Sequence, residues 1–283
     1  MMDTRDSILA GLKRMLRREI RLEIAGTAPE GTASTHFGGR PDLPGDFIWP
    51  EYTGEGIDGE RKKRPLAFLA QFRCADLAEL DSTGLLPCDG LLSFFYELDS
   101  QPWGYDPADA GCARVYWFRE CSALAPAGFP PELAEDLRLP AIGITMRAAE
   151  GLPGLEDYEL AHPNADSDDF YEVRAMFGSD APEISSKLLG WPDVIQNNMT
   201  RECALVSRGY YLGGDWSEVP EAAIREAEER SLEDWLLLFQ LDTVAQGDFE
   251  LMFGDCGRIY FYIRREDLAA RRFDRVWLIL QCC

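Results

Sequence analysis

The chain has 283 residues, of which 46% are hydrophobic, and its 50 acidic residues against 28 lysines and arginines give a formal net charge of −22. A chain of this length can bury a large core, as one domain or two. Its acidity makes nucleic acid and anionic membranes poor partners, because both attract a basic surface.

The apolar runs are short, and the eight cysteines show no paired spacing. Runs such as LLLF and WLIL are the size of a strand, far below the ~20 residues of a membrane span. Basic residues interrupt the apolar residues near the N-terminus, which a secretory signal would not allow. The absence of any CxxC pair favours reduced thiols. We therefore predict a cytoplasmic protein that does not enter membranes.

In chain order, the pattern predicts few helices and several strands. Apolar residues at helical spacing predict a helix over residues 5–24, and Pro220 followed by acidic residues predicts another over 219–234. A short third helix is expected at 131–138. Pro- and Gly-rich composition predicts loops at 99–111, 125–131 and 151–165. Runs of Leu, β-branched and aromatic residues predict strands at 66–72, 89–98, 113–118, 235–241, 256–263 and 274–280.

Four segments, three of them among these predicted strands, have a counterpart later in the chain, in the same order. FGGRPDLP (37–44) matches LLGWPDVI (188–195), and LAFLAQF matches WLLLFQL. Downstream, DGLLSFFYEL matches CGRIYFYI, and ARVYWF matches DRVWLIL. We predict a mainly β (α+β) fold in which a single domain contains two sequence-related β units, an internal duplication, with a few peripheral helices. The expected divisions are an N-terminal helix and lead-in at 1–32 and the domain at 33–283, with repeat one at about 33–120 and repeat two at about 184–283.

The ordered motifs FGGRPDLP, PLAFLAQF, LPCDGLLSFFYEL, LLGWPDVIQ, LLLFQLD, FGDCGRIYFYIRREDL and FDRVWLILQC resemble the YwqG-like family, a domain of unknown function. The resemblance covers about residues 33–283. It implies a mainly β, internally duplicated domain and no established enzymatic activity. Some relatives are encoded beside secreted polymorphic toxins, including those of type VI secretion systems, which implies an immunity role.

No constellation of residues predicts catalysis, a metal or a cofactor. His36 beside its Gly-Gly turn lacks the nucleophile elbow that it would need as a base. The cysteines are not at zinc spacing, and the run Asp166–Asp169 lacks the Gly and Glu of a calcium loop. No glycine-rich segment has a phosphate-binding signature. We therefore predict no catalytic residues, no metal ligands and no cofactor. The alternative is an enzyme or small-ligand protein with a carboxylate-lined pocket between the repeats.

Acidic residues concentrate in two windows. Residues 151–183 contain nine acids and one arginine, and residues 213–234 contain eight acids and two arginines. The stretch NADSDDFYE (164–172) is either a solvated loop or a contact for a basic partner. We predict that both windows lie on one face, with aromatic residues supplying binding energy. The predicted partner-binding residues are Asp166, Asp168, Asp169, Phe170, Tyr171, Glu172, Asp215, Trp216, Glu218 and Glu221.

The predicted partner is a cognate protein toxin with a basic surface. A toxin that cleaves nucleic acid, as a DNase does, presents a basic groove, and an acidic protein would cover it. The predicted function is therefore that of a cytosolic immunity protein that neutralises a secreted antibacterial toxin. The oligomeric state stays open.

Overall fold

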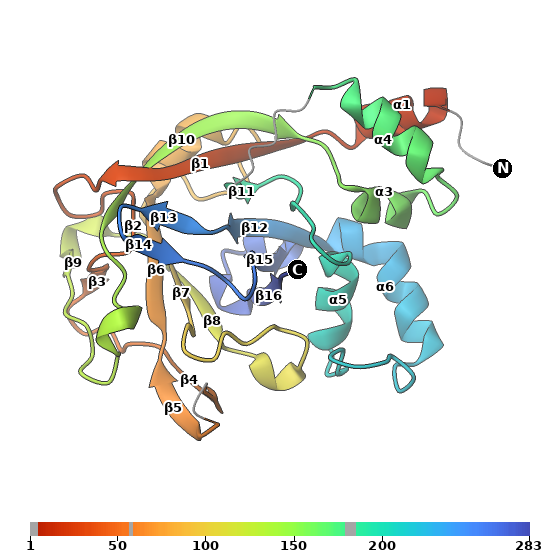
Figure 1. Cartoon of the computed structure of the whole chain (residues 1–283). Helices are drawn as coiled ribbons and strands as arrows, with labels where there is room; N and C mark the ends of the chain where they lie inside the picture. The colour runs from red at the N-terminus through yellow and green to blue at the C-terminus, as the bar shows by residue number, and fades with distance from the viewer. Residues whose placement is uncertain (1–4, 57–58, 179–184) are drawn as a thin grey trace.

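A ten-stranded antiparallel sheet is the central element of the protein (Figure 1). The computed structural model describes residues 5–56, 59–178 and 185–283. In spatial order the strands are β16 (Trp277–Gln281), β15 (Arg258–Arg264), β12 (Trp235–Leu241), β11 (Ser186–Leu189), β1 (Arg17–Thr27), β10 (Ile142–Gly151), β2 (His36–Phe37), β6 (Ala67–Arg73), β7 (Leu91–Tyr96) and β8 (Ala113–Phe118). The long pair β1–β10 thus lies between two groups of four strands.

Three small strand pairs and several helices surround this sheet. The pairs are β3 (Asp42–Pro44) with β9 (Leu124–Pro126), β4 (Glu51–Glu55) with β5 (Arg61–Pro65), and β13 (Val244–Gln246) with β14 (Phe249–Leu251). The α-helices are α1 (Arg5–Arg14), α2 (Cys74–Leu80), α3 (Leu155–Ala161), α4 (Ser167–Ala175), α5 (Met199–Val206), α6 (Glu221–Asp234) and α7 (Arg265–Ala269). Short 3₁₀ helices are η1 (Pro107–Asp109), η2 (Cys121–Ala123), η3 (Glu135–Leu137) and η4 (Phe273–Arg275). The mainly β architecture expected from the sequence is confirmed.

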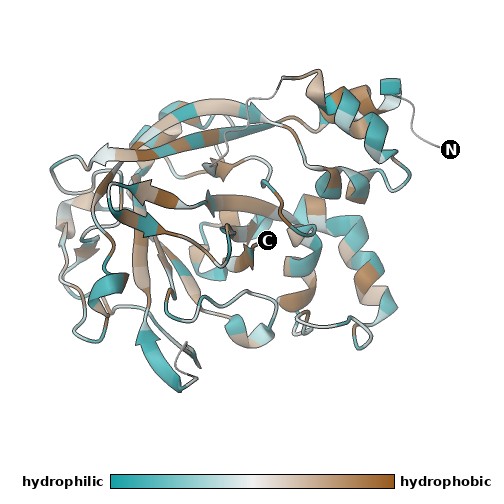
Figure 2. Cartoon of the chain, viewed as in Figure 1, coloured by the Kyte–Doolittle hydropathy of each residue, from teal (hydrophilic) through white to brown (hydrophobic). Residues whose placement is uncertain are grey.

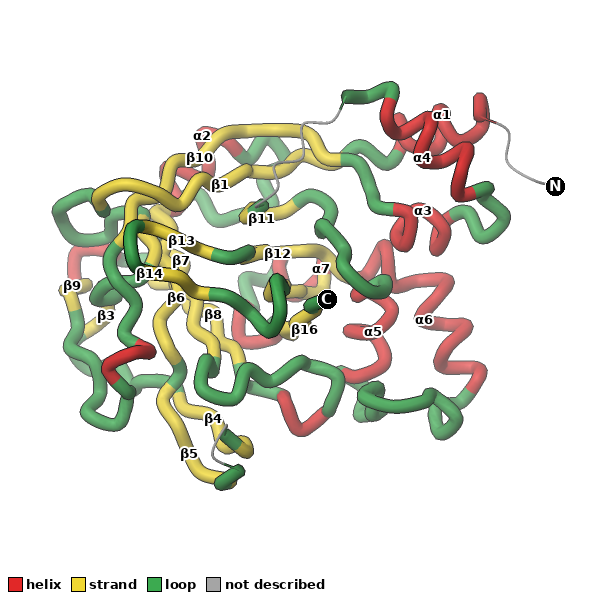
Figure 3. Tube along the Cα trace, viewed as in Figure 1, coloured by secondary structure: helices red, strands yellow, loops and turns green. Residues whose placement is uncertain are grey.

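Five helices gather at one side of the sheet. Helices α1, α3, α4, α5 and α6 lie together at the right in Figure 1 and appear as the red cluster in Figure 3. Packing links α1 to α4, α3 to both α4 and α6, and α5 to α6. The sheet therefore has a helical side that carries most of the acidic helices.

The predicted helix over residues 5–24 is wrong in its second half. Helix α1 ends at Arg14, and the chain enters β1 at Arg17. Within β1 the apolar residues Ile20, Leu22 and Ile24 alternate with charged ones, which is the period of a strand. These three side chains pack on the main core. Pairing with β10 and β11 places β1 in the middle of the sheet.

The six predicted strand runs correspond to β6, β7, β8, β12, β15 and β16. The helix predicted over 219–234 is α6. The helix expected at 131–138 is reduced to η3, and the loop expected at 151–165 contains α3.

The core joins both groups of four strands. The ring of Phe239 on β12 lies 4.7 Å from that of Phe94 on β7 and 5.5 Å from that of Phe72 on β6, measured between centroids. Phe94 also meets Phe261 on β15 at 5.3 Å. Brown colouring along the central strands in Figure 2 follows this apolar interior, whereas the β4–β5 hairpin is hydrophilic.

A buried glutamine organises the chain next to β6. Gln71 Nε2 donates to the Ser34 carbonyl (2.9 Å) and to Asp42 Oδ2 (2.6 Å). Gln71 Oε1 accepts from the backbone N–H of Asp42 (2.9 Å). Because these backbone groups are buried, the glutamine side chain satisfies hydrogen bonds that water cannot reach.

The same set of contacts recurs next to β12. Gln240 Nε2 donates to the Ser185 carbonyl (2.6 Å) and to Asp193 Oδ2 (2.7 Å), and Gln240 Oε1 accepts from Asp193 N–H (2.8 Å). Both glutamines are fully buried. Matching hydrogen bonds therefore hold β6 to the segments on either side of β2, and β12 to the segments on either side of β11.

Candidate functional site

The stretch 164–172 leads into and begins helix α4, so from Ser167 onward it is helical and not a loop. Asp166 is the N-cap, and its Oδ1 accepts from the backbone N–H groups of Asp168 and Asp169, at 3.1 Å each. Acidic residues in the first turn favour the positive end of a helix. Part of the acid in this window thus has a structural role in starting α4.

Phe170 is corrected from a surface contact to a core residue. Its side chain is fully buried and packs on the ring of Tyr158 at 5.0 Å, in a cluster with Ile8 of α1. Tyr171, the next residue, is 56% exposed. Of the two aromatic residues predicted to touch a partner on α4, Tyr171 is the one that solvent reaches.

Arg5 on α1 pairs with two of the predicted contact residues. Its Nε lies 2.6 Å from Asp169 Oδ1, and its Nη2 lies 2.6 Å from Glu172 Oε2. All three side chains keep substantial exposure, so these ion pairs are weak. Asp168 points into solvent, while Asp180 and Glu183 lie outside the described residues.

The second window combines a tight turn with the start of α6. The exposed Asp215 accepts from the backbone N–H of Ser217 at 3.0 Å. Trp216 is half-buried, with the Arg201 guanidinium 4.9 Å above its ring. Glu218 is exposed, and Glu221 pairs with Arg225 one helical turn later at 3.2 Å.

The two acidic windows lie on the same helical side of the sheet (Figures 1 and 3). Helix α6 has six acids and two arginines, and α3 has three acids and no base. Helix α3 belongs to the first window and packs against both α4 and α6, so it joins that window directly to the second.

A cavity of about 780 Å³ lies beside Trp216. One part of its wall comes from residues 103–109, which follow β7, and the other from residues 196–224, which include α5 and the start of α6. Four aromatic and three acidic side chains line it, namely Trp103, Tyr105, Tyr211, Trp216, Asp106, Asp109 and Glu202. The cavity therefore combines aromatic surface with carboxyl groups.

The loop carrying Trp103 and Tyr105 is held against β16. Trp103 O accepts from Leu280 N–H (3.0 Å), and Gly104 O accepts from the Trp277 indole N–H (2.9 Å). Gly104 adopts φ +82°, and a Cβ there would collide with the Leu278 carbonyl oxygen. Glycine is required at this close approach. Tyr105 O in turn accepts from Leu212 N–H (2.8 Å), which ties the two parts of the wall together.

Helix α5 is fixed by a buried polar chain. Asn198 caps it by accepting from Arg201 N–H (2.9 Å) and donates to Asp157 Oδ1 on α3 (2.6 Å). Thr200 Oγ1 donates to Asn198 Oδ1 (2.8 Å) and lies 3.1 Å from Ser231 Oγ on α6. Burial raises the pKa of Asp157 to about 7.

Three buried polar atoms at the cavity wall have no hydrogen-bond partner within the described part of the chain. They are Glu202 Oε2, Tyr105 Oη and Arg201 Nε. Glu202 is 2% exposed, and burial raises its pKa to about 8 despite the opposing influence of Arg201 and Tyr105. Burial also raises the pKa of Tyr105. Unpaired polar groups of this kind are costly in a core and mark a place where a ligand can supply the partner.

Sequence reasoning pointed to Trp216 and the neighbouring Tyr211 as contact residues, but not to Trp103, Tyr105 or Glu202. Trp103 and Tyr105 lie in a segment read as a loop from its Pro and Gly content, and Glu202 lies in the apolar helix MTRECALV. An acid within an apolar helical run was the available signal, because a lone carboxyl group on a buried face needs a reason.

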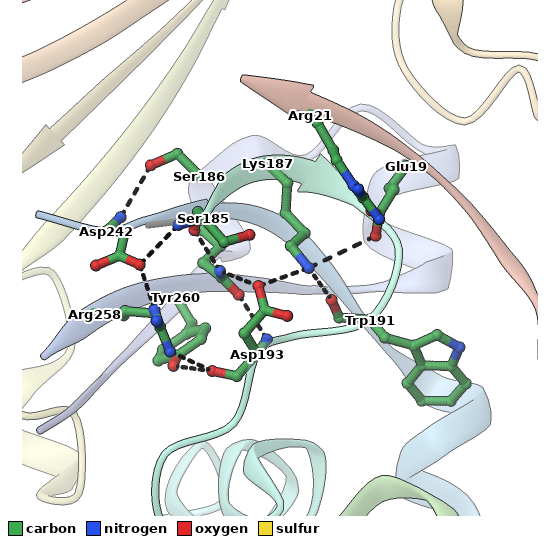
Figure 4. A network of polar contacts seen from close by, with 11 residues as sticks. Glu19, Arg21, Ser185, Ser186, Lys187, Trp191, Asp193, Asp242, Arg258 and Tyr260 are labelled. Atoms are coloured by element: carbon green, nitrogen blue, oxygen red, sulfur yellow. Dashed lines mark hydrogen bonds and ion pairs between the residues drawn. The ribbon is translucent and has the colours of Figure 1, made fainter. Parts of the chain in front are cut away.

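Lys187 centres a second buried polar network, shown in Figure 4. Its ammonium lies 2.7 Å from Asp193 Oδ2 and 3.7 Å from Glu19 Oε2, and it donates to the Trp191 carbonyl (3.1 Å). Burial acts to raise the pKa of Asp193, but Lys187 and the hydrogen bonds outweigh it and hold that pKa below its ordinary value. The network fixes the loop after β11.

His36 occupies the position beside β6 that Lys187 occupies beside β12. His36 pairs with Gln71 across the sheet, and Lys187 pairs with Gln240. His36 Nδ1 lies 2.8 Å from the Gly38 carbonyl oxygen. Burial lowers the pKa of His36. The neutral ring thus has a local structural contact, as expected for a residue beside a glycine turn.

The described ranges contain no group of three or more His, Cys, Asp or Glu side chains placed to hold a metal ion. Across the same ranges, no helix has the length and apolar character needed to cross a membrane. A search of curated proteins found no match. A family model described as a domain of unknown function (DUF1963) matches residues 35–282. Since this match spans most of the chain, the protein belongs to the DUF1963 family.

Proposed function

We propose that the protein binds a basic protein through the acidic helices on one side of its sheet. The observation that carries the proposal is the placement of α3, α4 and α6, from two separate acidic windows, on the same side. The resemblance to the YwqG-like family adds the class of partner. The protein then acts as a cytosolic immunity protein that neutralises a secreted antibacterial toxin with a basic, nucleic-acid-cleaving domain.

The charges on this side of the sheet contribute more to the rate of association with a partner than to the affinity of the final complex. Asp168, Glu218 and Glu229 are exposed and form no ion pair within the described residues. Such charges attract an opposite surface over roughly the Debye length of ~8–10 Å, and they raise the association rate. The exposed ring of Tyr171, on the same helix as Asp168, supplies apolar contact on α4.

The first test is the reading frame next to the gene, where the proposal expects a secreted toxin with a basic catalytic domain. Surface-plasmon kinetics with that purified domain then compare the wild type with the triple variant Asp168→Lys, Glu218→Lys, Glu229→Lys. We expect association to slow at least tenfold at low salt and the difference to shrink at high salt. Asp166 is left intact because it caps α4.

The matched control makes the same charge change on the other side of the molecule. Asp46→Lys, Glu132→Lys and Asp136→Lys alter exposed residues near β3, β9 and η3. This control should keep an association rate within about twofold of the wild type at physiological salt, where distant charges are screened. Equal kinetics in both triple variants would contradict the proposal.

We also propose that the two four-strand groups arose by internal duplication. The matching contacts of Gln71 and Gln240 support this proposal. Each strand also has a register shift just before its glutamine, between Phe68 and Ala70 in β6 and between Leu237 and Phe239 in β12. Leu189 has φ +59° where Gly38 has φ +57° in the corresponding loop. A leucine in this conformation is uncommon, and inheritance of the loop from a glycine-containing ancestor accounts for it.

The fourth sequence match is offset from the ladder. In the sequence match, Val115 aligns with Val276. In the sheet, however, Val115 pairs with Phe94, and the residue that pairs with Phe261, the counterpart of Phe94, is Leu278. In the proposed duplication, the structural alignment of β8 with β16 is therefore shifted by two residues from the sequence match.

The alternative of a ligand protein with a carboxylate-lined pocket between the repeats draws support from the 780 Å³ cavity. Its walls come from the end of repeat one and from repeat two, and they carry three carboxyl groups. This alternative and a basic partner are compatible, since a cavity of that kind suits a cationic group.

A further inference from the structure

The cavity between residues 103–109 and 196–224 favours a cation by charge. Asp106, Asp109 and Glu202 line it against the single base Arg201. Asp109 is already engaged, because its oxygens accept from Gly104 N–H (2.8 Å) and from the Tyr52 hydroxyl (3.2 Å). Asp106 Oδ1 accepts from Ala108 N–H (2.8 Å). Glu202 is therefore the buried acceptor that is left for a ligand.

The aromatic walls favour a flat cation. Trp103 is 44% exposed and Tyr211 is 57% exposed, although large aromatic side chains are usually covered. Arg201 already places its guanidinium over Trp216, which shows how such a group sits on a ring of this cavity. A guanidinium stacks on aromatic faces and is weakly hydrated, so it enters such a site more readily than an ammonium.

The unpaired atoms of the wall match the donors of a guanidinium. Glu202 Oε2 and Tyr105 Oη are both buried, have no hydrogen-bond partner within the described residues, and can each accept a hydrogen bond. A guanidinium offers five N–H donors in a planar fork and no acceptor, and it binds a carboxylate with two parallel bonds. One group can thus satisfy both atoms at once.

We infer that this cavity receives an arginine side chain of the basic partner, with its guanidinium between the aromatic walls and the carboxyl group of Glu202. The inference rests on the proposed function for the partner that carries the arginine. The chemistry of the cavity itself stands on the residues that line it.

Binding is expected to release a proton. With its pKa raised to about 8, Glu202 is mostly protonated at pH 7, and an adjacent cation favours the ionised form. The charged and titratable groups around it are Arg201, Tyr105 and Cys203, with Asp106 and Asp109 across the cavity. Affinity for a guanidinium should therefore increase between pH 6 and pH 9.

The probe is N-acetyl-L-arginine amide, titrated into the full-length protein by calorimetry at pH 7 in two buffers of different ionisation enthalpy. Its control is N-acetyl-L-citrulline amide, which has nearly the same shape without the charge. We expect saturable binding of the arginine probe with proton release, and citrulline binding at least tenfold weaker. Equal binding of both probes, or no saturable arginine binding, overturns the inference.

Two variants test the residues. Glu202→Gln keeps the shape of a side chain that is largely neutral at pH 7, and it should weaken arginine binding at least tenfold and abolish proton release. Trp103→Ala removes an exposed ring and should weaken binding at least fivefold. Glu132→Gln and Tyr171→Ala change an exposed acid and an exposed ring outside this cavity, and they should bind as the wild type does. Wild-type affinity in both test variants overturns the inference.

The same variants separate this inference from the proposed function. If the acidic triple variant loses the toxin domain while Glu202→Gln and Trp103→Ala bind it normally, the cavity is not used and the proposed function stands. If arginine binds the cavity but no basic protein partner binds the acidic side, the proposed function fails and the cavity chemistry stands.

Discussion

Glu202 places a carboxyl group where water barely reaches it. This residue of α5 lines the cavity with a side chain that is almost fully buried, and one of its oxygens has no partner among the described residues. Burial penalises the charged form more than Arg201 and Tyr105 favour it, which is why the pKa of Glu202 rises to about 8 from the ordinary 4.5. Such a group destabilises the fold once it has to ionise.

This raised pKa predicts a pH dependence of stability. Between about pH 4.5 and pH 8 the unfolded chain has lost the Glu202 proton while the folded protein retains it. The free energy of unfolding should therefore decrease as the pH rises through this window. Glu202→Gln removes this contribution, so its melting temperature should fall less than that of the wild type between pH 5 and pH 8 in thermal unfolding by circular dichroism.

Glu226→Gln is the control for that prediction. Glu226 is exposed and pairs with Arg208 through two contacts of 2.9 and 3.0 Å. Because its pKa is lowered and not raised, losing it should leave the downward slope between pH 5 and pH 8 in place. The same slope in Glu202→Gln as in the wild type would show that this carboxyl group is ordinary.

The type of a residue predicted its exposure well where its contacts come from nearby in the sequence. It predicted exposure poorly where the contacts come from distant parts of the chain. Asp168, Glu218 and Glu221 are on the surface, as charged residues generally are. Phe170 follows three acids and looks like a surface residue in sequence, yet α1, over 150 positions earlier in the chain, covers it. No local pattern contains that contact.

At the level of elements, the loop from β7 to η1 depends on one glycine. Gly104 combines φ +82° with a close approach to β16, and its neighbours Trp103 and Tyr105 form part of the cavity wall. A side chain here would both strain the backbone and push the loop away from the sheet. The arrangement of the cavity thus rests on a backbone contact.

Gly104→Ala should lower the free energy of unfolding by about 2–4 kcal/mol, since a left-handed non-glycine residue costs ~1–3 kcal/mol and the steric clash adds to it. Gly128→Ala is the comparison, because a Cβ at that position meets no atom within 4 Å. Urea denaturation measures both. Similar stability of the two variants would mean that the loop does not need its contact with Leu278.

Strands could be predicted from the apolar pattern in the segments that have a sequence match elsewhere in the chain. Secondary structure outside those segments was harder to predict. β6 and β12 are buried along most of their length and read as continuous apolar runs. β10 was missed because IGITMRAAEG mixes exposed and buried positions without a clean alternation. Helix α4 was hidden by its own acidic N-terminus, which resembles a loop in composition.

At the scale of the whole molecule, two buried glutamines hold equivalent positions. Gln71 and Gln240 each bind a backbone carbonyl before β2 or β11, and the backbone N–H and side chain of an aspartate after that strand. If the two groups share an origin, loss of either glutamine should have a similar effect.

Gln71→Leu and Gln240→Leu each strand a buried N–H and a buried carbonyl, at ~1–3 kcal/mol per unpaired group, so each should lower the free energy of unfolding by about 2–5 kcal/mol. The two values should agree within about 1 kcal/mol. Gln246→Leu changes an exposed glutamine with one bond to the Gly26 carbonyl (3.2 Å) and should change stability by less than about 0.5 kcal/mol. A large effect at one buried site and none at the other would argue against equivalent roles.

The order of elements in space was partly accessible from the repeated segments. They indicated two related groups of strands, but nothing local indicated that β1 and β10 would lie between them. That arrangement depends on pairings such as Arg17 with Gly151, which join distant parts of the chain.

The central position of β1 has a consequence for how the chain folds during synthesis. This strand leaves the ribosome before its two neighbours, because β10 and β11 are made only after more than 100 further residues. Until then its edges can pair with any exposed strand, including that of another nascent chain. Pairings between such distant segments also slow folding. The alternating charges Arg21 and Glu23 beside Leu22 keep the waiting strand soluble, so the pattern that was mistaken for a helix protects it before its neighbours arrive.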